Sequence, residues 1–226
     1  MRESVMTCLG SPLASQYGPA KAGDGTCNQM TENPTMALNS AALAPTYLPS
    51  EGTSRLIRQA GLVVLGTVLM TVAAKTQVPF FPVPQTLQTL AVFGIAAAYG
   101  RNLAVITMLA YLAQGIMGLP VFSGAASGPA YMMGPTGGYL VGFVIAAGIV
   151  GEAADRGLSK RPFAMFGTML VADIVVFALG FAWLATLIGA SKAFEFGVIP
   201  FVLGDLVKIA LASAVVAAAW KMLRRA

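Results

Sequence analysis

The sequence contains no histidine, few charged residues and only two cysteines. Without histidine, neither an imidazole metal ligand nor an imidazole general base is available. The cysteines, Cys8 and Cys27, stand in a polar N-terminal segment with no disulfide or metal-ligand spacing around them. We therefore predict no metal site, no cofactor and no catalytic residues.

Charged residues make up 10% of the 226 residues, whereas hydrophobic residues make up 57%. Soluble domains contain about 25% charged residues, and their surfaces must be covered with polar groups. The net charge of +5 is carried by too few and too scattered residues to follow a nucleic-acid backbone. The composition therefore predicts an integral membrane protein surrounded by lipid, and it excludes nucleic acid as a partner.

Residues 1–50 differ from the rest of the chain. They are rich in Gly, Ser, Thr, Asn and Pro and show no sustained helical or strand period, which predicts disorder. No apolar run follows a basic start, so this segment is not a signal peptide. The internal methionines Met30 and Met36 leave a misplaced start codon as an alternative. The predicted membrane domain occupies residues 51–226.

Within the membrane domain, apolar blocks alternate with short polar or Pro/Gly-rich segments. About 20 residues span the hydrocarbon core, and shorter runs can do so inside a bundle. Because backbone polar groups must be satisfied internally in lipid, each block is expected to be helical. The predicted fold is an all-α bundle of six transmembrane helices at residues 56–74, 86–99, 102–118, 137–151, 163–189 and 197–220.

The distribution of basic residues predicts the orientation. Six helices place both termini and the loops after the second and fourth helices on one side of the membrane. That side collects nine basic residues, against Lys75 and Lys192 on the other side. Basic loops mark the cytoplasm, so both termini are predicted to be cytoplasmic, in a multi-pass protein of the cell (inner) membrane. The nine residues are Arg55, Arg58, Arg101, Arg156, Lys160, Arg161, Lys221, Arg224 and Arg225.

Small residues recur at four-residue spacing in two of the predicted helices. Such rows let helix backbones approach closely in lipid. Chance is the alternative, because Gly and Ala are abundant in this chain. The rows are Gly138, Gly142 and Ala146 in one helix, and Ala210, Ala214 and Ala218 in the other.

Three ionisable residues lie inside predicted membrane helices, where charges are costly and usually functional. Asp205 and Lys208 are three residues apart, so they share one helix face, about 12–16 Å from the outer end at 1.5 Å per residue. An anionic solute would pair with Lys208, and Asp205 would accept hydrogen bonds from its donor groups. The alternative is an ion pair that only fixes helix packing. Asp173 lies at similar depth, and we expect it to be a structural partner of Lys208.

Uncharged polar residues gather at the predicted outer ends of the second, third and fourth helices. Binding pockets need a few converging polar groups on an apolar wall. Any one of these residues could instead be an interfacial anchor or form a hydrogen bond between helices. The residues are Gln85, Gln88, Tyr111, Gln114, Thr136 and Tyr139.

Several of these segments, taken in order, resemble the BioY family, the biotin-binding S components of energy-coupling factor (ECF) transporters. The resemblance covers roughly residues 55–225, and it rests on the whole ordered set of motifs. The motifs are Pro84-Gln85-Thr86-Leu87-Gln88-Thr89-Leu90, Tyr111-Leu112, Gly118-Leu119-Pro120-Val121-Phe122, Gly134-Pro135-Thr136-Gly137-Gly138-Tyr139-Leu140-Val141-Gly142-Phe143, Pro200-Phe201 and Gly204-Asp205-Leu206-Val207-Lys208.

The resemblance implies a six-helix bundle that binds biotin near the outer face, with a membrane coupling protein and cytoplasmic ATPases as partners. It places Asp205 and Lys208 at the pocket, walled by Gly134 to Tyr139, including Gly137, and by the loop before the second helix. Biotin also suits the residues themselves. Its carboxylate calls for a cation, its ureido N–H groups for an acceptor and its ring for an apolar wall.

Two other functions compete with solute capture. An intramembrane enzyme would use Asp173 and Asp205 as a carboxylate pair, one of them protonated, but the lysine beside Asp205 favours its ionised form. A structural membrane protein without a ligand would leave the buried charges unexplained. An S component for another small anionic vitamin remains the nearest alternative.

Overall fold

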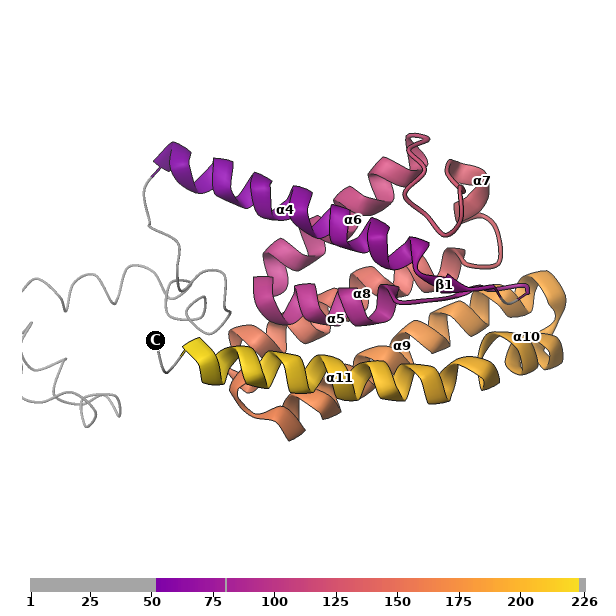
Figure 1. Cartoon of the computed structure of the whole chain (residues 1–226). Coiled ribbons are helices and arrows are strands. Elements are labelled where there is room, and N and C mark those ends of the chain that lie inside the picture. Colours follow the sequence, from indigo (N-terminus) through magenta and orange to yellow (C-terminus); the bar gives the residue numbers. More distant parts are fainter. Residues whose placement is uncertain (1–51, 80, 224–226) are drawn as a thin grey trace, which may run out of the picture. The chain divides into compact units, whose positions relative to one another are not determined.

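The computed structural model describes residues 52–79 and 81–223. The prediction for residues 1–50 lies outside these ranges. Figure 1 shows the helices running side by side, with the chain returning repeatedly between two ends of a bundle. The helices are α4 (Gly52–Lys75), α5 (Gln88–Tyr99), α6 (Arg101–Ile116), α7 (Pro129–Met132), α8 (Gly137–Asp155), η3 (Leu158–Lys160), α9 (Pro162–Ile188), α10 (Ala190–Gly197) and α11 (Ile199–Leu223).

Each predicted apolar block overlaps a helix of the structure, namely α4, α5, α6, α8, α9 and α11. Within residues 52–79 and 81–223, four segments are long and apolar enough to cross a membrane. Three of them contain α4, α8 and α9, and the fourth contains α10 together with α11. Helices α5 and α6 have only 12 and 16 residues. The chain is thus a largely helical protein with several helices that are able to span a membrane.

Helix α8 forms the centre of the bundle, packed against α5, α6 and α9. Two thirds (67%) of its span is buried, against 17% for α4. Glycines make this position possible: a Cβ on Gly138 would lie 2.5 Å from the Leu179 carbonyl oxygen, and one on Gly142 would lie 2.9 Å from the Val176 Cα. Because only glycine permits this approach, Gly138 and Gly142 of the predicted row are confirmed at the contact with α9.

The second predicted row of small residues has a different environment. Ala210, Ala214 and Ala218 are all exposed on α11. The buried face of that helix instead carries Ile209, Ala212 and larger residues. The prediction of a helix contact within the chain was wrong here, because alanine spacing alone does not say which face of an apolar helix meets its neighbours.

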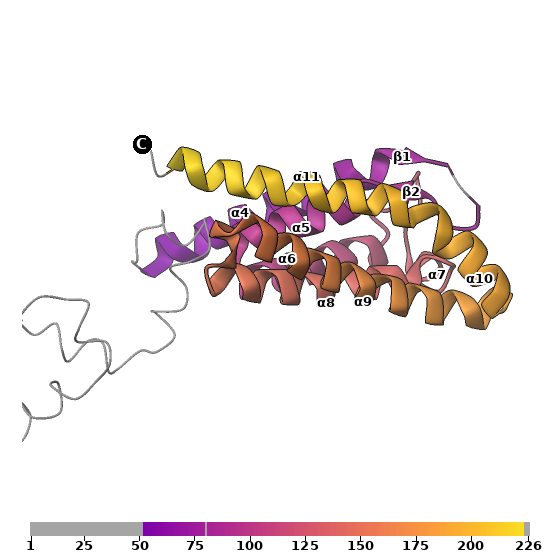
Figure 2. The same ribbon diagram turned by 90° about the horizontal axis from the view of Figure 1, so that it is seen from below.

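One end of the bundle is built from irregular segments. Strands β1 (Gln77–Val78) and β2 (Gln85–Thr86) pair antiparallel in the connection between α4 and α5, a small departure from the predicted all-α fold. Figures 1 and 2 place this hairpin, α7 and α10 together at the same end. Two hydrogen bonds also join this connection to the loop between α6 and α7. Ser123 donates to the Gln77 side chain, and Lys75 donates to the Gly124 carbonyl oxygen. This end corresponds to the predicted outer face.

The opposite end is closed by exposed ion pairs. Glu152 of α8 lies 3.2 Å from Arg101 of α6 and 2.9 Å from Arg156. The backbone N–H of Arg101 donates to Asp155 at 2.9 Å. Arg101, one of the nine basic residues that predicted a cytoplasmic side, therefore joins α6 to α8.

Candidate ligand-binding cavity

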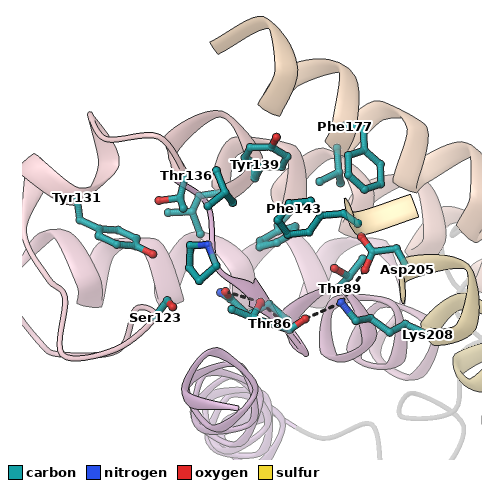
Figure 3. A pocket seen from close by; sticks show the side chains of 16 residues that line it. Thr86, Thr89, Ser123, Tyr131, Thr136, Tyr139, Phe143, Phe177, Asp205 and Lys208 are labelled. Carbon is teal, nitrogen blue, oxygen red and sulfur yellow. Dashed lines mark hydrogen bonds and ion pairs between the residues drawn. The ribbon is translucent and has the colours of Figure 1, made fainter. Parts of the chain in front are cut away.

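A cavity lies between α5, α8, α9 and α11, in the half of the bundle next to the predicted outer face. About 50 Å³ of it is open to a water-sized sphere, within a hollow of about 520 Å³ that also counts the gaps between side chains and the open space at its mouth. Figure 3 shows Asp205 and Lys208 at one end and Ser123 and Tyr131 at the other. Sixteen residues line the cavity: Val83, Pro84, Thr86, Gln88, Thr89, Ser123, Tyr131, Thr136, Tyr139, Leu140, Phe143, Val176, Phe177, Phe201, Asp205 and Lys208.

Asp205 and Lys208 form a buried ion pair at the inner end of the cavity. The Lys208 Nζ donates to Asp205 Oδ1 at 2.6 Å, and the two side chains are only 11% and 8% exposed. The Thr89 hydroxyl of α5 also hydrogen-bonds to Asp205. The pair therefore presents donors and acceptors to the cavity while its two charges largely offset each other.

Lys208 also connects α11 to the outer hairpin. Its Nζ donates to the Thr86 carbonyl oxygen of β2 at 2.6 Å, as Figure 3 shows. An ammonium group has three donors, so one remains after these two bonds for a ligand in the cavity. The hairpin thus positions the cationic end of the site.

Aromatic and aliphatic side chains form the walls between the two ends. The Tyr139 ring meets Phe177 edge to face, with centroids 6.4 Å apart, and its hydroxyl donates to the Gly197 carbonyl at 2.7 Å. Phe143 and Phe201 are buried beside them. The Tyr139 ring fits because Gly180 leaves space, since a Cβ there would lie 2.2 Å from it. This wall suits an apolar ring system.

The outer end of the cavity is uncharged and polar. Ser123, Tyr131 and Thr136 line it. The Thr136 Oγ1 is buried and has no hydrogen-bond partner among the described residues. The same three residues, with Pro84, also line a wider hollow of about 840 Å³ between the outer loops. The cavity therefore continues towards the predicted outer face.

Gln88 lines the cavity, and a chain of hydrogen bonds holds its side chain in place. Its Nε2 donates to the Tyr111 hydroxyl at 3.0 Å, and its Oε1 accepts from Thr86 Oγ1 at 3.0 Å. The Tyr111 hydroxyl in turn donates to the Val121 carbonyl. This chain fixes the start of α5 beside the cavity.

Five of the eight predicted site residues lie together here. The structure places the other three, Gln85, Gln114 and Gly137, outside the cavity lining. Gln85 packs on α11, where a Cβ on Gly204 would meet its amide. Gln114 points to Thr67 of α4 at 3.4 Å, and Gly137 allows close passage of the Met132 carbonyl. The five lining residues are Asp205, Lys208, Tyr139, Gln88 and Thr136.

Several lining residues were not predicted as site residues, although the motifs of the family resemblance contain Thr86, Thr89, Phe143 and Phe201. From the sequence alone, Phe143, Phe177 and Phe201 cannot be distinguished from phenylalanines that face lipid, because the sequence predicts the helix but not which face points inward. Thr86 and Thr89 carry a detectable signal, because each lies within three residues of Gln88 on the segment already chosen.

Comparison with known proteins decides the family. A sequence profile of the BioY family matches residues 40–225. The chain belongs to the BioY family. A probable biotin transporter BioY of Pyrococcus horikoshii is 38% identical over 155 residues, covering 69% of this chain and 91% of the relative. The biotin transporter BioY of Thermotoga maritima is 37% identical over 149 residues, covering 65% and 86%.

The fold comparison agrees with the family. A crystal structure of the S-component for biotin from an ECF-type ABC transporter superposes with a TM-score of 0.67 at 22% identity, covering 76% of this chain and 95% of the other. At that identity the likeness establishes the fold. The membrane-crossing helices and the BioY membership together make this chain a multi-pass membrane protein.

Proposed function

We propose that this chain is a biotin-binding membrane subunit that captures biotin from the outer face for uptake. The buried Asp205–Lys208 pair at the inner end of an apolar cavity carries the proposal. A buried ion pair is a weak source of stability. The free-energy cost of burying the pair is accounted for if a polar group of the ligand completes the pair's hydrogen bonds. The names of its relatives indicate biotin as that ligand.

The ion pair can bind only one of the two polar ends of biotin. The ureido ring and the carboxylate lie at opposite ends of that molecule, whereas the Asp205 and Lys208 head groups are 2.6 Å apart. A ureido group can donate its N–H to Asp205 and accept from Lys208. A carboxylate placed there would be repelled by Asp205. We therefore place the ureido ring at the pair, in preference to the sequence-based pairing of Lys208 with the carboxylate.

The rest of biotin then follows the cavity outward. The fused ring would lie against Tyr139, Phe143 and Phe177. The carboxylate would reach the outer end, where the Thr136 hydroxyl has no partner among the described residues. The alternative, a different small anionic vitamin, would need its own donor and acceptor groups at the pair.

The proposal includes a transport context. All six long helices cross the cell (inner) membrane, with both termini cytoplasmic. A membrane coupling protein and cytoplasmic ATPase subunits supply the energy for uptake. The chain itself catalyses no reaction. Two observations support this assignment: the excess of basic residues on one side of the predicted bundle, and the chain's membership of the BioY family.

Calorimetric titration of the purified protein in detergent tests the ligand. Biotin is expected to bind tightly at one molecule per chain, whereas thiamine and riboflavin should not bind. Biotin methyl ester, which lacks the charge, tests orientation: a carboxylate at the outer end predicts a modest loss of affinity. Binding of another vitamin in place of biotin would refute the biotin assignment, and abolished binding of the ester would place the carboxylate at Lys208.

A further inference from the structure

Tyr111 lies behind the cavity and contacts it only through another residue. It belongs to α6, is 1% exposed, and is not one of the sixteen residues that line the cavity. Its hydroxyl makes two hydrogen bonds: it accepts from Gln88 Nε2 and donates to the Val121 carbonyl oxygen, each at 3.0 Å. Tyr111 is therefore buried outside the cavity but bonded directly to its lining.

These two bonds fix the orientation of the Gln88 amide. A hydroxyl group has one proton to donate, and a carbonyl oxygen only accepts. The Tyr111 proton therefore goes to Val121, and the Tyr111 oxygen accepts from the Gln88 NH₂ group. The Gln88 Oε1 is then left for Thr86, whose hydroxyl donates to it at 3.0 Å. Because the two ends of an amide have nearly the same shape, it is Tyr111 that determines which end faces Thr86.

Thr86 extends this chain of hydrogen bonds to the ion pair. Its hydroxyl also accepts from the Gln88 backbone N–H at 3.3 Å, so Gln88 holds it twice. The Thr86 carbonyl oxygen accepts from Lys208 Nζ at 2.6 Å, the bond drawn in Figure 3. The Lys208 ammonium group is therefore bonded to a residue that Tyr111 holds through Gln88.

The Tyr111 ring is held independently of its hydroxyl. It packs edge to face on Phe122, with ring centroids 5.6 Å apart. Phe122 fills the space beside Gly115, where a Cβ would overlap its ring, and it stacks on Tyr131 of the outer lining at 4.9 Å. A phenylalanine at position 111 should therefore keep the ring in place and remove only the two hydrogen bonds.

We propose that Tyr111 is a positioning residue, whose hydroxyl holds Lys208 at the ligand through Gln88 and Thr86. This rests on the proposed function, in which Lys208 donates to the ureido oxygen of biotin. Without the hydroxyl, the Gln88 amide can turn over and Thr86 loses its fixed acceptor. The Thr86 carbonyl and the ammonium group bonded to it then gain freedom that ligand binding must remove, which lowers affinity. Tyr111 acts without touching the ligand.

Biotin titrations of Tyr111→Phe and Tyr99→Phe test the proposal. Both tyrosines are buried and donate to a backbone carbonyl oxygen, but Tyr99 bonds Leu62 of α4 and neither of those two residues lines the cavity. We expect binding about tenfold weaker in Tyr111→Phe, the size typical of coupled neighbours, and wild-type binding in Tyr99→Phe. Thermal melting should show a small loss of stability in both, so affinity distinguishes positioning from packing.

A double-mutant cycle tests the path of the effect. Thr86→Val removes the hydroxyl that Gln88 holds. Adding Tyr111→Phe to Thr86→Val should therefore weaken binding by less than about twofold more, whereas independent sites would add their losses. If Tyr111→Phe does not fold, Gln88→Met breaks the same chain at its next residue and takes its place in the cycle.

Three results would overturn the proposal: wild-type affinity in Tyr111→Phe, equal weakening by the two tyrosine variants, or additive losses in the cycle. A wild type that does not bind biotin would instead overturn the proposed function.

Discussion

The two ends of the bundle use charge differently. In the half next to the predicted outer face, the Asp205 and Lys208 side chains are 8% and 11% exposed and border a cavity. At the inner end, Glu152 and Arg101 are 34% and 60% exposed and join helices at the surface. Exposed pairs contribute little to stability, whereas breaking a buried pair leaves an uncompensated charge. The comparison separates a buried pair that we propose binds the ligand from exposed pairs that join helices at the surface.

Breaking the buried pair should have the largest effect. Asp205→Ala and Lys208→Ala each leave a buried charge without its partner, which costs about 3–5 kcal/mol of folding stability. Each variant also removes a charged hydrogen-bond partner of the ligand, worth about 1.5–3 kcal/mol, or about 10- to 150-fold in affinity. Titration with biotin measures this loss of affinity. Lys192→Ala, an exposed cation of α10, is the matched control and should bind normally. Wild-type affinity in Lys208→Ala would remove that residue from the site.

Filling the space behind the aromatic wall should have the next largest effect. Gly180→Ala places a Cβ 2.2 Å from the Tyr139 ring, and such overpacking costs about 1–3 kcal/mol. We expect a lower melting temperature and weaker biotin binding. Gly167→Ala in the same helix meets nothing within 4 Å, so it should change neither. If the two variants have the same melting temperature and the same biotin affinity, the position of the Tyr139 ring affects neither quantity.

Breaking the inner ion pairs should have a smaller effect, confined to stability. Glu152→Gln removes the charge that both Arg101 and Arg156 contact. Its melting temperature in detergent should fall less than that of Gly180→Ala, and biotin affinity should stay at the wild-type value. A large loss of affinity would show that the two ends are coupled.

Removing residues 1–39 should have the smallest effect. These residues lie outside the part of the chain that matches the BioY family. Biotin affinity of the shortened protein, measured by the same titration, should equal that of the full chain. Weaker binding would assign these residues a part in the site.

The sequence predicted the long helices well because lipid leaves the backbone few options. It also found Asp205 and Lys208, since charges within apolar runs stand out. It did not find α10 or the β1–β2 hairpin, because short polar segments carry no period. Gln85 and Gln114 show the main limit: a polar residue at the right depth can face a neighbouring helix as easily as a cavity, and helix rotation is set by packing partners that are distant in sequence.

A structure of the complex with biotin tests the central claim most directly. The account predicts the ureido ring between Asp205 and Lys208 at hydrogen-bond distances of about 2.7–3.2 Å, with the carboxylate near Thr136. Biotin bound away from this pair, or a pair still closed on itself beside an empty cavity, would contradict it.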